Sequence, residues 1–275
     1  MRVDLPGVLI KVALTLIALK LLVWWLEPRM AFFPLRGVQE TPSIAGVPFR
    51  DVKVLTADGE TLHGWWLEHT APRAQIVFFH GNGGNLSLWL DLLVEIWRRE
   101  FSVFAVDYRG YGASTGSASE QGLYKDANAA VRFFAEQLRQ ERTPVVYWGR
   151  SIGAPVAAHA ATVIAPDALV LETPWPEVRA VLRSSPVLWA LSFLSSYRFP
   201  TSRFLESYRG PLLVVHGDAD SIVPFGAGKR VYDLASTPQK RFVAIPGADH
   251  NDLHVVSPEF YWQNIDSFAM SLSRR

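Results

Sequence analysis

A serine stands between two glycines at the end of an apolar run, in the segment Gly-Arg-Ser-Ile-Gly at 149–153. Residues 145–148 are rich in β-formers, and an alanine-rich stretch follows the second glycine. This pattern predicts a strand, a sharp turn and a helix with Ser151 at the apex, where the flanking residues must lack bulk. Such a turn exposes the Ser151 hydroxyl and leaves the N–H of Ile152 at a helix N-terminus, where it can bind an oxyanion. We therefore predict that Ser151 is a nucleophile.

A serine hydroxyl becomes a good nucleophile when a base accepts its proton, so a histidine must reach Ser151. Seven histidines compete for this role. His250 lies in the loop at 246–252, after the last predicted strand, where ligand sites of parallel sheets are found. His80 and His216 each precede a glycine at a strand end, which favours a turn or packing role. His250 is therefore the predicted base.

A carboxylate must orient that histidine, and the loop after the predicted strand at 212–215 offers two. These are Asp218 and Asp220, and spacing alone does not separate them. Either can also be an ordinary loop aspartate that accepts backbone N–H groups.

A glycine-rich loop, His-Gly-Asn-Gly-Gly-Asn at 80–85, follows the predicted strand at 75–79. Together with the Ile152 N–H, a backbone N–H of this loop makes a two-donor oxyanion hole, and each donor contributes roughly 2.7–4 kcal/mol. We assign Asn82 as the second donor. A phosphate-binding loop is the alternative, but the chain lacks the Gly-x-x-x-x-Gly-Lys-Ser/Thr pattern. The glycines at 110–116 miss the dinucleotide-binding spacing, so we interpret that segment as a structural loop.

The elements that must position these residues follow a regular order. A turn signal at 57–59 separates two alternating segments, 51–56 and 61–68, which predicts a β-hairpin. Beyond it, apolar strands alternate with amphipathic helices: predicted strands at 75–79, 102–107, 144–148, 168–171, 212–215 and 241–245, and predicted helices at 86–98, 120–140, 151–163, 177–196, 226–235 and 258–272. This order predicts an α/β fold with a mostly parallel central sheet flanked by helices.

The segment from Leu5 to Leu26 is apolar apart from Lys11, Thr15 and Lys20, and as a helix it is about 33 Å long, enough to cross a bilayer. The two lysines lie near its ends, where they can reach the interface, and on opposite faces, which favours a spanning helix over one lying flat.

We predict a transmembrane anchor at 1–28 and a catalytic domain at 29–275. A cleaved signal peptide is the alternative, but Trp24, Trp25 and Arg29 are typical of interfacial anchoring. Basic residues flank both ends of the apolar segment, so the side of the membrane that the domain faces stays open.

Composition excludes several classes of function. The 27 basic and 26 acidic residues nearly balance and form no cationic run, which argues against a nucleic-acid partner. There is no cysteine, so disulfides and thiolate metal sites are excluded. The histidines are dispersed and no His-Glu-x-x-His motif is present, so we expect neither a metal nor a cofactor.

Taken in order, five blocks of sequence resemble the α/β-hydrolase superfamily, and within it the membrane-anchored Bem46-like group: His-Gly-Asn at 80–82, Asp-Tyr-Arg-Gly-Tyr-Gly at 107–112, the serine motif at 149–153, His-Gly-x-x-Asp-x-x-Val-Pro at 216–224, and Gly-x-x-His-Asn at 247–251. The match runs from about Arg29 to the C-terminus. The resemblance implies that Asp220 is the acid, in the chain order Ser, Asp, His, and it also implies an N-terminal anchor. Asp249 is a departure, because relatives often have glycine there.

Residues 173–207 are predicted to form a short, cap-like helical insert after the sixth predicted strand. Its apolar side chains include Trp175, Trp189 and Phe193, which we predict either to line an acyl pocket or to face lipid near the anchor. Ordinary helix-on-sheet packing is the alternative for these residues.

The sequence therefore predicts a serine hydrolase that cleaves carboxylester or thioester bonds of apolar, lipid-like acyl substrates. An aminopeptidase or amidase with the same residues, a triad-bearing lyase or perhydrolase, and a non-catalytic membrane scaffold are the alternatives.

Overall fold

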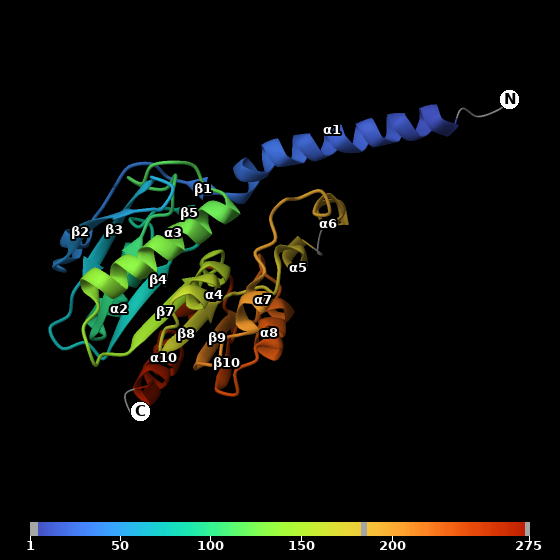
Figure 1. The fold of residues 1–275 in the computed structure, drawn as a ribbon. Coiled ribbons are helices and arrows are strands. Elements are labelled where there is room, and N and C mark those ends of the chain that lie inside the picture. Colours follow the sequence, from blue (N-terminus) through green and yellow to red (C-terminus); the bar gives the residue numbers. More distant parts are fainter. Residues whose placement is uncertain (1–4, 183–185, 273–275) are drawn as a thin grey trace.

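The computed structural model describes residues 5–182 and 186–272. Within them, eight strands form one sheet in the order β10-β9-β8-β7-β4-β6-β3-β2 (Figure 1). β2 and β3 form the predicted antiparallel hairpin, β3 is antiparallel to β6, and the other neighbours are parallel, which confirms the predicted mostly parallel sheet. The strands are β2 (Arg50–Leu55), β3 (Thr61–Leu67), β4 (Ala74–Phe79), β6 (Phe101–Val106), β7 (Val145–Arg150), β8 (Ala168–Glu172), β9 (Leu212–Gly217) and β10 (Lys240–Ile245).

The central strands are buried at every position and mostly apolar, because both faces of the sheet are covered. Alternate side chains enter two separate cores, so that Val77 and Phe79 of β4 lie on one face while Ile76 and Phe78 lie on the other. The first face packs against α3 (Glu120–Phe133), α4 (Gly153–Val163) and α8 (Phe225–Leu234), and the second against α2 (Leu90–Arg98) and α10 (Pro258–Leu272). Burial of each large apolar side chain contributes about 1.5–3 kcal/mol, which holds the layers together.

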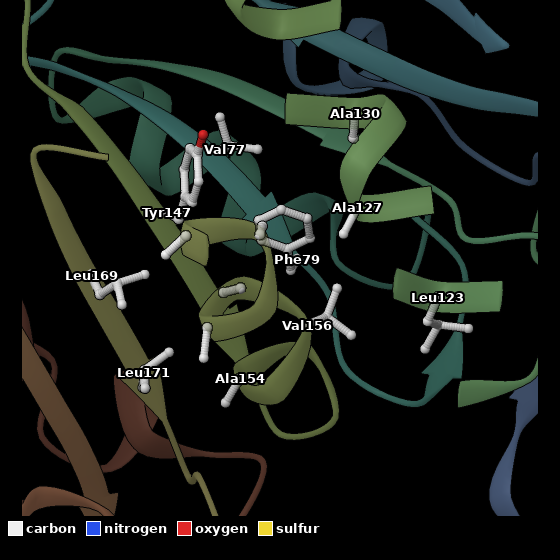
Figure 2. Packing of buried hydrophobic residues seen from close by; sticks show 14 of the residues in the cluster. Val77, Phe79, Leu123, Ala127, Ala130, Tyr147, Ala154, Val156, Leu169 and Leu171 are labelled. Carbon is white, nitrogen blue, oxygen red and sulfur yellow. The ribbon is translucent and has the colours of Figure 1, made fainter. Parts of the chain in front are cut away.

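Small residues let α4 approach the sheet closely. Its alanines, including Ala154, are buried. Figure 2 shows the apolar side chains that meet on this face of the sheet, among them Val77, Phe79, Leu123, Ala127, Ala130, Tyr147, Ala154, Val156, Leu169 and Leu171. The close approach fixes the turn that joins β7 to α4.

Helix boundaries differ from the sequence prediction at several places. The predicted helix at 86–98 begins only at Leu90, and the one at 120–140 changes after Phe133 into a π-helix, η2 (Phe134–Leu138). The predicted helical region at 177–196 consists of α5 (Val178–Leu182) and α6 (Pro186–Leu191), with 183–185 outside the described residues. Two further short helices, α7 (Thr201–Leu205) and α9 (Leu253–Val256), were not predicted, because so few residues carry no helical periodicity.

The N-terminal helix α1 (Leu5–Ala31) projects from the domain on the side where the insert with α5 and α6 lies (Figure 1). It is long and apolar enough to cross a membrane. The chain then forms β1 (Phe33–Pro34), which pairs in parallel with β5 (Gly83–Gly84), and a short 3-10 helix, η1 (Pro42–Ala45). The sequence analysis did not predict the β1–β5 pair, which joins the end of α1 to the glycine-rich loop.

Candidate active site

Ser151 occupies a strained turn between β7 and α4. Its backbone φ is +54°, in the left-handed region that residues other than glycine rarely adopt. A Cβ atom on Gly149 would collide with the carbonyl of Gly153, and one on Gly153 would collide with the carbonyl of Phe79. The two glycines therefore make the turn possible, and the Ser151 N–H donates to the carbonyl of Glu172 at 2.9 Å, which ties the turn to β8.

His250 lies between the serine and an aspartate. Its Nε2 atom is 2.9 Å from the Oγ of Ser151, and its Nδ1 atom is 2.9 Å from Oδ2 of Asp220. The three side chains come from the ends of β7, β9 and β10, whose carboxyl ends meet at one edge of the sheet. The structure thus brings together the three residues that the sequence analysis selected.

Asp220 has a fully buried side chain that receives several hydrogen bonds. Its Oδ1 accepts the N–H groups of Ile222 at 2.9 Å and Val223 at 2.7 Å, and its Oδ2 also lies 3.2 Å from Nε2 of His216. Burial by itself raises the pKa of Asp220, but the hydrogen bonds from His216 and His250 outweigh it, so the pKa lies below the ordinary value. The lowered pKa keeps the carboxylate of Asp220 ionised beside His250.

Asp218, the other aspartate of this loop, faces a different partner. Its Oδ1 accepts the N–H of Gly247 at 2.7 Å, and the residue is exposed. The tertiary structure therefore separates two residues that spacing left equivalent.

Asp249 joins the loop that carries the acid to the loop that carries the base. Its Oδ1 accepts the N–H of Ser221 at 2.7 Å and the N–H of His250 at 2.7 Å, and the Ser221 hydroxyl donates to it at 2.8 Å. These hydrogen bonds lower the pKa of Asp249, and they outweigh burial and the nearby charge of Asp220, which would raise it. Asp249 therefore holds the two loops together through hydrogen bonds to Ser221 and His250.

Asn82 and Ile152 both border the cavity in front of Ser151. Within the described residues, no backbone hydrogen bond occupies either N–H group. Tyr111 donates its hydroxyl to the carbonyl of Asn82 at 2.9 Å and lies 3.1 Å from its side-chain oxygen, so it fixes the loop from behind. The sequence analysis read this part of the chain only as a structural loop, because a tyrosine carries no local signal of such a contact.

The cavity at Ser151 measures about 400 Å³, a size typical of small-molecule pockets. Its walls are mostly apolar, and Trp175 is one of the residues that line it. Trp189 and Phe193, in contrast, do not belong to the lining. They are 42% and 54% exposed, and their rings pack edge to face with centroids 5.0 Å apart.

One wall of the cavity comes from α1, which extends to Ala31, beyond the predicted anchor at 1–28. Val23, Leu26, Glu27, Met30 and Ala31 all line it. Spacings of three and four residues place these side chains on one face of the helix. The sequence does not reveal which face of α1 contacts the domain, because the helix carries apolar residues on all sides.

Arg150, directly before the serine, is buried behind the site. Its guanidinium donates to the carbonyl of His250 at 3.2 Å and lies 3.8 Å from the carboxylate of Glu172, which also accepts the hydroxyl of Tyr261. Burial raises the pKa of Glu172, and the charge of Arg150 acts against that shift.

The mostly parallel sheet, the serine turn and the loops at the carboxyl ends of the strands define an α/β-hydrolase. A model of the Hydrolase_4 family, described as serine aminopeptidase S33, matches residues 70–209. The chain therefore belongs to this family of α/β-hydrolases.

Relatives match over most of the chain. The Mycobacterium tuberculosis protein Rv2307c is 35% identical over 250 residues, which cover 90% of this chain and 88% of that protein. The Saccharomyces cerevisiae membrane protein YNL320W is 28% identical, with 86% and 84% covered. The Pyrococcus furiosus esterase Pf2001 has the same fold, with a TM-score of 0.72, 19% identity and coverage of 88% of this chain and 98% of the esterase.

Proposed function

We propose that this protein is a serine hydrolase that cleaves carboxylester or thioester bonds of apolar acyl substrates through an acyl-enzyme on Ser151. The proposal rests on the contacts that join Ser151 Oγ to His250 and His250 to Asp220. Ser151 also lines an apolar cavity. The Bem46-like sequence blocks support the same assignment, and we propose that the protein belongs to that group.

In the proposed reaction, Asp220 accepts the Nδ1–H of His250, so Nε2 is free to take the proton of Ser151. Ser151 Oγ bonds to the acyl carbon, and the carbonyl electron pair moves onto oxygen, and the resulting oxyanion accepts hydrogen bonds from the N–H groups of Asn82 and Ile152. His250 then gives the proton to the leaving alcohol or thiol as its bond to carbon breaks. Water, deprotonated by His250, adds to the acyl-enzyme, and the acid leaves as Ser151 regains its proton.

We further propose that α1 is retained as a single-pass membrane anchor. Its side chains form part of the cavity wall, which a cleaved signal peptide would leave incomplete. The yeast relative named a membrane protein supports this assignment. Intact-mass measurement of the mature membrane protein is expected to find the segment present, and a mass that lacks it would overturn the anchor.

An aminopeptidase activity is the second candidate, because the family description names one. An aminopeptidase needs an acidic group to receive the substrate ammonium. Among the described residues that line the cavity, Glu27 is the charged one, and its carboxylate already accepts hydrogen bonds from Ser195, Ser196 and Tyr197. This engagement favours acyl esters, and comparison of nitrophenyl acyl esters with aminoacyl anilides separates the two activities.

The test is labelling of the full chain in membranes with a fluorophosphonate probe. We expect the parent chain to label, and Ser151→Ala and His250→Ala to lose labelling while they remain folded. A folded parent chain that does not label would contradict the proposal and favour a non-catalytic scaffold.

A further inference from the structure

The last turns of α1 are both part of the predicted anchor and part of the cavity in front of Ser151. The helix extends for 27 residues, about 40 Å, whereas a bilayer core of about 30 Å needs only about 20 of them. With the N-terminal portion in the membrane, the last two turns emerge from it. Leu26 and Met30, which line the cavity, lie in these turns, and Val23, which also lines it, lies at the boundary just before them.

Side chains typical of the membrane–water interface lie near the same end of α1. Trp24 and Trp25 are exposed, and the guanidinium of Arg29 lies 4.4 Å from the ring centroid of Trp25. Tryptophan and arginine gather at the membrane–water boundary. The cavity therefore opens beside the bilayer rather than far out in water.

Glu27 fastens the cap insert to this helix. Its carboxylate accepts the N–H groups of Ser196 at 3.1 Å and Tyr197 at 3.3 Å, and the hydroxyls of Ser195 and Ser196 also donate to it. Phe32, just after the helix, packs edge to face on Tyr197 with centroids 5.5 Å apart. The insert and α1 thus form one continuous wall.

The segment directly after α1 contacts the glycine-rich loop that carries Asn82. Phe33 and Pro34 pair with Gly83 and Gly84, directly after Asn82. The N–H of Leu35 donates to the carbonyl of Gly84 at 2.9 Å. The position of α1 is therefore tied both to the cap and to the loop that carries the proposed oxyanion donor.

We propose that the carboxyl-terminal turns of α1 select the substrate: the acyl chain of a membrane-dissolved, long-chain ester lies against Val23, Leu26 and Met30, while Glu27 holds the cap against the same wall. This inference rests on the proposed function of Ser151. It assigns to the anchor helix a role in specificity in addition to attachment.

The test compares Leu26→Trp with Leu21→Trp in the full chain in detergent micelles. Leu21 is 59% exposed, and five residues correspond to about 140° around the helix, so it faces away from the cavity wall. Leu26→Trp fills the proposed acyl path. We expect its kcat/KM for nitrophenyl dodecanoate to fall at least about tenfold, with nitrophenyl butyrate changed less than about twofold. Leu21→Trp is expected to leave both within about twofold of the parent.

Fluorophosphonate labelling of each variant separates this inference from the function on which it rests. A parent chain that does not label overturns the serine chemistry. Labelling of all chains with an unchanged dodecanoate-to-butyrate ratio in Leu26→Trp overturns the role of α1 alone. If Leu26→Trp does not fold, Leu26→Ala takes its place, with an expected loss of about threefold to tenfold on dodecanoate only.

Discussion

The guanidinium of Arg150 donates to the backbone carbonyl of His250 at 3.2 Å, although the two residues lie a hundred positions apart in the chain. Arg150 immediately precedes Ser151, so this hydrogen bond ties the nucleophile turn to the loop that carries the proposed base. The contact is buried, and the charge that makes it is balanced by Glu172. Arg150 is therefore a positioning residue for the proposed Ser151–His250 pair.

Replacement of Arg150 by Met is expected to lower kcat by about 10–100-fold, because a small displacement of His250 lengthens its contact with Ser151. The matched variant is Glu172→Gln, which breaks the same buried ion pair without removing the donor to His250. Both variants are expected to lose stability, by about 3–5 kcal/mol, since each leaves one polar partner buried. Urea unfolding and ester hydrolysis measure the two effects, and equal kcat losses in both variants would mean a purely structural role.

Asp220→Asn is expected to lower kcat by about 10⁴, because an amide supports the wrong tautomer of His250. The control is Asp218→Asn on the same loop, whose carboxylate caps the N–H of Gly247 instead. Activity of the control is expected to stay within about twofold of the parent. The assignment of the acid fails if the two substitutions have similar effects on ester hydrolysis.

His254 makes the stability of the fold depend on pH. Burial, aided by the charge of Arg150, lowers its pKa to about 4, from 6.5 in the unfolded chain. Between these values the unfolded chain binds the proton and the folded chain does not, so stability decreases as the pH falls from about 6.5 towards 4.

His254→Gln removes this proton linkage, and the Tm difference between pH 7 and pH 5 is expected to shrink by about 2 °C. The matched control is His69→Gln, which replaces a half-buried histidine packed edge-on against Trp97. Thermal unfolding at both pH values measures the difference. An unchanged pH dependence in His254→Gln would contradict the assignment.

Trp189 and Phe193, predicted either to line the pocket or to face lipid, are exposed side chains of the insert. We expect the double change Trp189→Ser, Phe193→Ser to reduce hydrolysis of esters embedded in vesicles about fivefold to tenfold, because these side chains favour the membrane interface. Hydrolysis of soluble butyrate esters is expected to change less than about twofold.

The matched control for this prediction is Phe260→Ser, since Phe260 is 44% exposed on α10. It is expected to leave vesicle activity at the parent level. If the double variant instead loses equal activity on esters in vesicles and on the soluble ester, the two aromatic side chains act at the active site and not at the membrane.

Much of the fold followed from the sequence because its signals are local. Apolar strands alternating with amphipathic helices predicted the mostly parallel sheet, and the glycines at 149 and 153 predicted the turn at Ser151, since only a residue without a Cβ atom fits beside it. His250 followed from its place after the last strand, because the carboxyl ends of parallel strands share one edge. The choice of Asp220 over Asp218 came from family resemblance.

The tertiary structure decided which distant residues meet. Spacing left Asp218 and Asp220 equivalent, and only the fold directs one carboxylate to His250 and the other to Gly247. The uniform apolarity of α1 predicted a membrane helix but concealed that Val23 and Leu26 also face the cavity. Contacts such as Arg150 with His250 join segments a hundred residues apart, and no local pattern encodes them, because packing of the whole sheet brings those segments together.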